Sequence, residues 1–391
     1  MSNSFKTFLK HTAKDFHNQS VNPPVVRAST IIFKSMKDIR KTQAKAIKNP
    51  TGGHYDYGRQ GTSTTYILQK ILTKLEESYH VFTTPTGFGA VFLAIFSVTR
   101  PGDEIIVADP VYSPTRILTE NFLNEFNIKT TFYDPHDLKT LEKSITNKTK
   151  LIFVENPGSN SFDFQDLGKI ISIAKKHKIL TAMDNTWGTP YFLKPIKLGF
   201  DMAIVSATKY YSGHSDVMGG SLAVNKKVFP KVKAAERITG LRLGPDDAYL
   251  ITRGLRTLDV RLDRHRENAK KVAEFLSKNK KFKLLYPYKK DSYNFRMWKK
   301  YYSGASGLMG VQIKSKNVNS IRKFVNSLKL FGYGYSWGGF ESLALHQEFR
   351  ETGKRKYLKL KKDEHLVRFH IGLEDPSDLI ADIKQALKHL K

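Results

Sequence analysis

Residues 151–185, LIFVENPGSNSFDFQDLGKIISIAKKHKILTAMDN, decide the fold class. The apolar run LIFV at 151–154 predicts a buried strand, and residues 166–178 carry apolar side chains at helical spacing. A second apolar run, ILTAM at 179–183, predicts another strand. A helix between two strands is typical of a parallel sheet, because parallel neighbours need a long crossover connection.

The same alternation extends on both sides of this unit. An amphipathic helix at 63–78 precedes a strand at 80–86, and a further strand is predicted at 201–209. After about residue 255 the regular alternation of strands and helices ends. A long helical stretch at 257–279 then leads to a smaller unit of strands and helices. We therefore expect an α/β protein with a large domain, built on a mostly parallel central sheet, and a smaller C-terminal α/β domain.

The composition gives the chain a strongly basic character. It has 65 Lys and Arg against 36 Asp and Glu, a formal net charge of +29, and no cysteine. Such a charge first suggests a nucleic-acid or anionic-membrane partner. The lysines, however, are spread over every segment, without a dense basic block, zinc-ligand spacing or a ribonucleoprotein motif, so we expect neither partner. The lack of cysteine excludes disulfides, thiolate catalysis and cysteine metal sites, and we expect no metal.

The apolar segments of the chain are short. The N-terminal residues lack the apolar core of a signal peptide, and the longest apolar run, AVFLAIFSV at 90–98, is too short to cross a bilayer. The expected location is therefore the cytoplasm.

Three polar clusters fall at the predicted carboxyl ends of strands, where an open parallel sheet binds its ligands. Asp184 ends one strand, Ser206–Lys209 follows another, and Gly87–Phe88 opens a helix after a third. A lysine, an aspartate and a helix N-terminus together suit pyridoxal phosphate, which needs a Schiff-base amine, a partner for its ring nitrogen and N–H donors for its phosphate. The spacing alone leaves open a solvated lysine and an ordinary turn at Asp184.

Longer motifs around this cluster point to one family. The segment SATKYYSGHSDVMGG at 206–220 resembles the cofactor-lysine segment of the Cys/Met-metabolism pyridoxal-phosphate enzymes, which include cystathionine lyases and synthases and methionine γ-lyase. Other segments resemble the same family in family order: YGRQGT (57–62), PTGFGAV (85–91), VYSPTR (111–116), ENPGS (155–159), MDNTW (183–187), PDDAYLITRGLRTL (245–258), YSWGGFESL (335–343) and VRFHIGLED (367–375). The resemblance implies the aspartate-aminotransferase-like fold, known as fold type I, with pyridoxal 5'-phosphate as cofactor.

The resemblance also implies a role for each matching residue. Lys209 would be the Schiff-base lysine, Asp184 would hold the ring nitrogen, and Tyr112 would stack on the ring. Six residues would bind the phosphate: Gly87, Phe88, Ser206 and Thr208 of one subunit, with Tyr57 and Arg59 of its neighbour. Four would face the substrate: Arg368 and Ser336 at its α-carboxylate, Trp337 on the side of the pocket, and Asn156.

A phosphate site with residues from two subunits implies that the protein is an oligomer. The resemblance also divides the chain into three segments. Residues 1–60 would form an arm that reaches the neighbouring subunit, 61–255 the large cofactor-binding domain, and 256–391 the C-terminal domain. The family resemblance implies a homotetramer built as a dimer of dimers.

The reaction depends on which bond breaks after Lys209 removes the Cα proton of the substrate. Loss of sulfur from Cβ defines a β-lyase, and loss from Cγ a γ-lyase or γ-synthase. ENPGSN at 155–160 and YSWGGFESL at 335–343 depart from the γ-type patterns and look like bacterial cystathionine β-lyases, although Asn156 stands where such enzymes often have serine. We expect cleavage of L-cystathionine with water to L-homocysteine, pyruvate and ammonia, a step of methionine biosynthesis.

Other functions remain open on the sequence. They are γ-elimination or γ-synthesis, alanine racemisation with Lys209 and Tyr112 as catalytic groups on opposite faces, and a binding protein that has lost activity. A basic nucleic-acid-binding protein is the alternative that the net charge supports.

Overall fold

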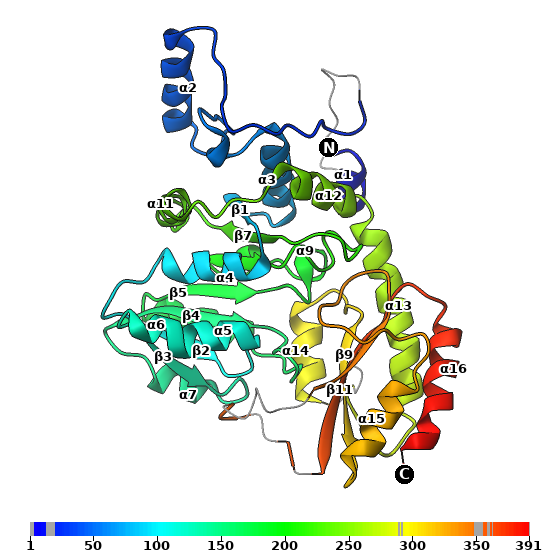
Figure 1. Ribbon diagram of the computed structural model, residues 1–391. Coiled ribbons are helices and arrows are strands. Elements are labelled where there is room, and N and C mark those ends of the chain that lie inside the picture. The colour runs from blue at the N-terminus through cyan, green and yellow to red at the C-terminus, as the bar shows by residue number, and fades with distance from the viewer. Residues whose placement is uncertain are drawn as a thin grey trace.

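The computed structural model describes residues 4–12, 20–287, 290, 292–347, 355–357, 360–361 and 363–390, and Figure 1 shows how the elements are arranged. The strands are β1 (His80–Thr84), β2 (Glu104–Ala108), β3 (Lys129–Tyr133), β4 (Thr149–Glu155), β5 (Leu180–Asp184), β6 (Met202–Val205), β7 (Gly220–Val224), β8 (Phe282–Leu285), β9 (Leu308–Lys314), β10 (Leu343–Gln347) and β11 (Glu364–His370).

Helices occur throughout the chain. Those before residue 200 are α1 (Phe5–Lys10), α2 (Met36–Lys48), η1 (Gly58–Gln60), α3 (Ser63–Leu75), α4 (Gly87–Phe96), α5 (Ser113–Ile117), η2 (Leu118–Phe122), α6 (Leu123–Glu125), α7 (Leu138–Lys143), α8 (Leu167–Lys176), α9 (Thr189–Phe192) and α10 (Pro195–Leu198). Those after it are α11 (Phe229–Thr239), α12 (Pro245–Leu255), α13 (Leu258–Leu276), α14 (Tyr293–Tyr301), α15 (Val318–Asn326), α16 (Pro376–Ala386) and η3 (Leu387–His389).

The large domain is built on a seven-stranded sheet in the order β1-β7-β6-β5-β4-β2-β3. Successive residues 151–154 of β4 point to opposite faces, yet all are buried, so both faces of the sheet are covered. The pairs β2–β3, β2–β4, β4–β5 and β5–β6 are all parallel, so the predicted, mostly parallel sheet is confirmed. The exception is β7, which runs antiparallel to both β1 and β6 and which we did not predict. Since β1 and β6 both oppose β7, they share a direction, and their carboxyl ends meet at one edge.

The C-terminal unit has a four-stranded antiparallel sheet in the order β10-β11-β9-β8. Helices α13, α15 and α16 lie together beside it, and their apolar side chains share one core cluster with β9 and β11 (Figure 1). Helix α13 joins the two units, because Leu258 and Leu262 pack in the large core and Val272 and Leu276 pack in the smaller one.

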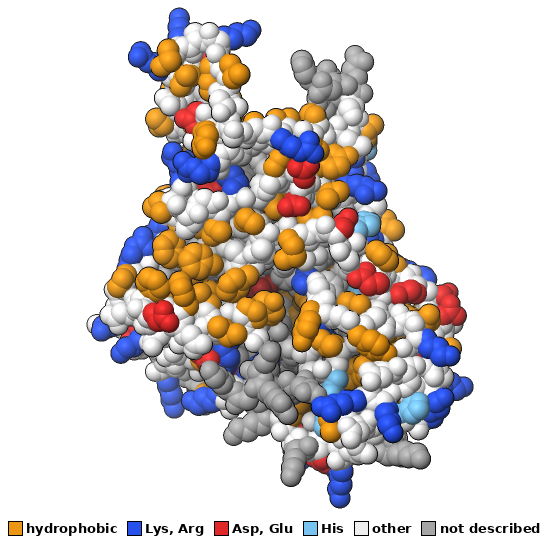
Figure 2. All heavy atoms as spheres, in the orientation of Figure 1, with side chains coloured by type: hydrophobic (Ala, Val, Ile, Leu, Met, Phe, Trp, Pro, Cys, Tyr) orange, Lys and Arg blue, Asp and Glu red, His pale blue; other side chains and the backbone are white. Residues whose placement is uncertain are grey.

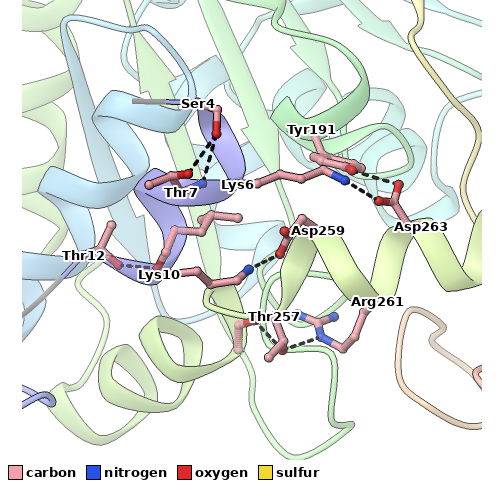
Figure 3. Close-up of polar contacts among 12 residues, drawn as sticks. Ser4, Lys6, Thr7, Lys10, Thr12, Tyr191, Thr257, Asp259, Arg261 and Asp263 are labelled. Atoms are coloured by element: carbon pink, nitrogen blue, oxygen red, sulfur yellow. Dashed lines mark hydrogen bonds and ion pairs between the residues drawn. The ribbon is translucent and has the colours of Figure 1, made fainter. Parts of the chain in front are cut away.

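The N-terminal segment, predicted as one arm, has two parts that behave differently. Helix α1 is fixed to its own chain: Leu9 is fully buried, and Lys6 Nζ lies 2.8 Å from Asp263 Oδ2 on α13 (Figure 3). Lys10 forms a second ion pair with Asp259 of the same helix. Helix α2, by contrast, has no buried residue and projects from the body of the molecule (Figure 1). Whether any of this segment reaches a neighbouring subunit stays a prediction.

Across the described ranges, we find no helix with the length and apolar character needed to span a bilayer. Among the same residues, no group of three or more His, Asp or Glu side chains is arranged to hold a metal ion.

Candidate active site

Lys209 lies in a tight turn that follows β6 at the carboxyl edge of the large sheet. Its N–H donates to the Ser206 carbonyl at 3.1 Å, and its own carbonyl accepts from the Gly213 N–H at 2.9 Å. The amine Nζ donates to Ser336 Oγ at 2.6 Å and lies 5.4 Å from the centre of the Trp337 ring. The structure therefore brings the predicted lysine together with two predicted substrate residues from the C-terminal unit.

The surroundings of Lys209 favour its neutral amine. Burial, and then the positive charge of Arg368, lower its pKa to about 8, against a smaller opposing effect of Asp184. At pH 7 this makes the neutral fraction about 300-fold larger than that of an ordinary lysine. A neutral amine is the form that attacks an aldehyde or accepts a proton.

The pKa of Lys209 predicts how cofactor-free protein takes up pyridoxal phosphate. The rate of capture should rise with pH as the amine loses its proton and level off above about pH 8, because the neutral amine is the nucleophile. The measurement is the growth of visible cofactor absorption after mixing, from pH 6 to 10. A rate that continues to rise up to pH 10 would mean that Lys209 has an ordinary lysine pKa.

The loop that carries Ser336 approaches the lysine closely. Ser336 has a φ of +77°, and Gly338 has a φ of +92°. A side chain at Gly338 would place its Cβ only 2.9 Å from the backbone carbonyl carbon of Lys209, so glycine is required there. The Gly338 N–H donates to Nε2 of His370 at 3.0 Å, and Nδ1 of that ring faces the Glu341 carbonyl at 3.0 Å. These contacts keep the loop against Lys209.

Asp184 is the last residue of β5. Its Oδ1 accepts from the Thr186 N–H at 2.9 Å and from the Thr186 hydroxyl at 2.6 Å, and that hydroxyl accepts from the Ser206 N–H at 2.9 Å. Burial raises the pKa of Asp184, while the bonds from Thr186 and the charge of Lys209 lower it. The carboxylate is thus held rigidly on the neighbouring strand, as a partner for a cationic ring nitrogen requires.

The start of α4 forms the third part of the site. Thr86 caps the helix, because its hydroxyl accepts from the Gly89 N–H at 2.9 Å. A side chain at Gly87 would place its Cβ 2.4 Å from Ser206 Oγ, so this glycine lets the helix start approach the serine hydroxyl. The N–H groups of the first helical turn have no partner within the helix. A phosphate group fits this arrangement of helix N-terminus and hydroxyl.

Two other predicted phosphate residues are placed as follows. Phe88 lies in the first turn of α4 with its side chain partly exposed. The Thr208 hydroxyl accepts from the Gly219 N–H at 3.0 Å and lies 3.2 Å from the Gly219 carbonyl. Thr208 therefore closes the turn after Lys209, and its contact with phosphate stays a prediction.

Tyr112 and Arg368 face this cluster from two domains. Tyr112 precedes α5 and is half exposed. Burial and the charges of Glu155 and Asp184 raise the pKa of its phenol, and the charge of Arg368 lowers it. Arg368, on β11, donates through Nη2 to the Ser336 carbonyl at 3.2 Å, and burial lowers its pKa. The guanidinium is thus close enough to influence both Tyr112 and Lys209.

Asn156 is the predicted substrate residue that the structure places in the core. It is 1% exposed, its Nδ2 donates to the Tyr302 hydroxyl at 2.9 Å, and its Oδ1 accepts from the Gln165 N–H at 2.7 Å. The peptide bond between Asn156 and Pro157 is cis. Contact between this side chain and substrate stays a prediction.

Tyr57 and Arg59 lie at η1, beside α11. Arg59 Nη1 donates to the Arg237 carbonyl at 3.1 Å, and its guanidinium carbon lies 5.8 Å from the centre of the Tyr57 ring. A cavity of about 500 Å³ lies next to them, between residues 42–60 and α11, and none of the predicted site residues lines it. The two residues belong to a different part of the chain from the Lys209 cluster, and their role toward a neighbouring subunit stays a prediction.

Sequence reasoning missed two ionisable side chains next to Tyr112. Glu155 accepts the Tyr112 N–H through Oε2 at 2.6 Å, and Arg355 donates to the Val111 carbonyl at 3.3 Å. Glu155 stood within the ENPGS segment and, as the residue that ends a strand, could have been identified. Arg355 lies in a basic stretch without a motif, and only the folded chain shows its contacts.

Comparison with known proteins identifies the family of the chain. The family model described as "Cys/Met metabolism PLP-dependent enzyme" matches residues 6–388. The chain is 36% identical over 370 residues to a cystathionine beta-lyase of Bordetella avium, covering 94% of this chain and 92% of that protein. It is 35% identical over 379 residues to an L-alanine/L-glutamate racemase of Wolbachia pipientis wMel, covering 95% and 93%.

A solved structure is similar along the whole chain. A cystathionine gamma synthase from Xanthomonas oryzae pv. oryzae, in complex with aminoacrylate and cysteine, superposes with a TM-score of 0.90 at 27% identity and covers 100% of this chain and 99% of that one. The similar proteins thus carry names for different reactions.

Proposed function

This chain belongs to the Cys/Met metabolism PLP-dependent enzymes, and we propose that within this family it is a cystathionine β-lyase. Pyridoxal phosphate is the cofactor, and Lys209, Asp184 and the start of α4 would hold its aldehyde, ring nitrogen and phosphate. The observation that carries the proposal is the position of Trp337, whose ring lies 5.4 Å from the Lys209 amine. Trp337 follows Ser336 in the segment YSWGGFESL, which departs from the γ-type pattern. Its ring would cover the substrate side of the pocket.

Arg368 and Lys209 would each perform a different step of the reaction. When bound, the cofactor supplies an electron sink for negative charge at the substrate Cα. Arg368 would bind the α-carboxylate, because a guanidinium matches a carboxylate with two parallel hydrogen bonds. Lys209, with a pKa of about 8, would then take the Cα proton, and homocysteine would leave from Cβ as its thiolate.

Replacing Arg368 tests the carboxylate site. Arg368→Ala should raise KM for cystathionine about 10- to 100-fold, the usual worth of a charge-assisted contact, with a smaller effect on kcat. Because Arg368 also lowers the pKa of Lys209, the acidic limb of the pH–rate profile should move to higher pH in this variant. Arg368→Lys keeps the charge and should leave that limb in place. An unchanged KM in Arg368→Ala would place the carboxylate elsewhere.

The proposed active site includes residues of a neighbouring subunit. Tyr57 and Arg59 would reach the phosphate of a neighbouring subunit in a homotetramer. Helix α2 without buried residues and the apolar patch over α4, η2 and α6 in Figure 2 support such contacts. Exposed apolar side chains of these elements are Phe88 and Phe96 on α4, Phe122 on η2 and Phe126 at the end of α6. Light scattering of the purified protein decides the point: the mass of four chains supports the proposal, and the mass of one chain contradicts it.

Racemisation is a second candidate, supported by the similarity to the Wolbachia enzyme and by Tyr112 beside the Lys209 cluster. Lys209 would remove the Cα proton from one face of alanine, and the Tyr112 phenol would return a proton on the other. Optical purity of L-alanine after hours with concentrated enzyme tests this directly, since unchanged L-alanine rules the activity out.

Substrate preference tests the main proposal. Purified protein with pyridoxal phosphate should have a kcat/KM for L-cystathionine at least about tenfold above that for L-methionine. A preference for L-methionine, measured as total keto acid formed, would replace the β-lyase proposal with a γ-lyase.

A further inference from the structure

One peptide unit next to the site is held at both of its polar groups. The Val111 carbonyl accepts from Arg355 Nη2 at 3.3 Å, and the Tyr112 N–H donates to Glu155 Oε2 at 2.6 Å. These two groups belong to the same planar peptide bond, so the two contacts fix its plane. The orientation of that plane helps to set the position of the Tyr112 Cα, from which the side chain extends.

Arg355 reaches this peptide from the C-terminal unit. It lies between β10 and β11, is 6% exposed, and its Nη1 donates to the Ser159 carbonyl at 2.8 Å. The next two backbone N–H groups, of Lys356 and Tyr357, donate to the carboxylate of Asp109 at 3.1 and 3.0 Å. This short segment is therefore docked on the loops that follow β2 and β4 in the large domain.

Glu155 reaches the same peptide from the sheet. It ends β4 directly opposite Asp184 in the register with β5. Burial and the neighbouring Asp184 raise its pKa well above the usual range, while the Tyr112 N–H and the charge of Arg355 lower it. Removing a carboxyl group from water costs free energy, and the hydrogen bond from the Tyr112 N–H offsets part of that cost.

We propose that Arg355 and Glu155 form a peptide clamp that positions Tyr112 against the cofactor. The clamp rests on the proposed role of Tyr112 as the residue that stacks on the ring. It also connects the C-terminal unit, which carries Arg368, to the Tyr112 loop, so that the carboxylate site and the ring-stacking residue keep a fixed relation. Arg355 and Glu155 would act as positioning residues, through their contacts with the Tyr112 peptide.

Arg355→Ala should lower kcat about 10- to 100-fold, because one charge-assisted contact that orients Tyr112 is lost. It should also change the visible circular dichroism of the bound cofactor, which reports the orientation of the ring's surroundings. Millimolar guanidinium should restore part of both signals. Arg100→Ala is the matched control, since Arg100 also donates to a backbone carbonyl, that of Thr99 at 2.6 Å, but is exposed between α4 and β2. Arg100→Ala should change neither signal.

A double-mutant cycle separates positioning from general support of the fold. If Arg355 acts through Tyr112, Arg355→Ala should cost little further kcat in a Tyr112→Ala background. The same loss of kcat in both backgrounds would overturn the clamp. Glu155→Gln retains an acceptor for the Tyr112 N–H and should keep the dichroism of the wild type, whereas Glu155→Ala should change it. An unchanged dichroic band in both Glu155→Ala and Arg355→Ala would also overturn the clamp.

The dichroic band needs no substrate. Failure of the β-lyase proposal would therefore leave this readout intact, and the two proposals can fail independently.

Discussion

Lys209→Ala is expected to reduce cleavage of L-cystathionine at least about 1,000-fold, because the variant loses both the amine that anchors the cofactor and the base that takes the Cα proton. The visible absorption band of protein-bound pyridoxal phosphate should disappear with it. The measurement is the initial rate of keto-acid formation, with the absorption spectrum of the dialysed protein recorded beside it.

Two variants serve as controls for Lys209→Ala. Lys209→Arg keeps a positive charge next to Ser336 and should be equally inactive, because a guanidinium neither captures the aldehyde nor accepts a proton near neutral pH. Lys226→Ala removes an exposed lysine and should change neither signal. A Lys209→Ala protein that turned over normally would mean that another amine performs the chemistry.

Asp184→Asn is expected to lower kcat about 100- to 1,000-fold, because it removes the buried charge that keeps the ring nitrogen of the cofactor protonated. The fold should tolerate this change. The amide oxygen of asparagine can still accept from the Thr186 N–H and hydroxyl, which now bind Asp184 Oδ1. Burial also raises the pKa of the native carboxyl, so removing its charge should not lower the melting temperature of the cofactor-free protein.

Asp201→Asn is the matched control for Asp184→Asn. Asp201 accepts the Thr181 N–H at 2.9 Å and the Thr181 hydroxyl at 3.2 Å, a pattern similar to that of Asp184, but it precedes β6 at the opposite edge of the sheet. The kcat of the Asp201→Asn variant, calculated per mole of folded protein, should stay within about twofold of the wild type. Equal losses in both variants would indicate a general effect on the fold and not a role for Asp184.

The parts of the fold that local pattern determines were predictable. Residues 151–185 form β4, α8 and β5 as expected, because buried parallel strands read as continuous apolar runs. We did not predict β7, which begins with glycine and derives its place from pairing with β1 and β6. Strand direction at such a position depends on contacts far apart in the chain, which no local pattern encodes.

The same distinction applies to the site. Lys209, Asp184 and the start of α4 were predicted because each lies at the carboxyl end of a predicted strand and within a segment that resembles the family, and the structure brings Lys209 together with Ser336 and Trp337. The peptide clamp was not predicted, because Arg355 binds backbone carbonyls. Such contacts depend on tertiary position and leave no mark on residue spacing. For Asn156, the buried contact with Tyr302 could not be predicted, since the two residues are 146 positions apart.

The most direct test of the proposed β-elimination is the identity of the keto acid formed from L-cystathionine. Purified protein with pyridoxal phosphate would be incubated with this one substrate, and pyruvate, 2-oxobutanoate, homocysteine and cysteine would be measured in the same reaction. We predict pyruvate and homocysteine in equal amounts. 2-Oxobutanoate with cysteine would show that the bond at Cγ breaks instead, and would contradict the role given to Trp337.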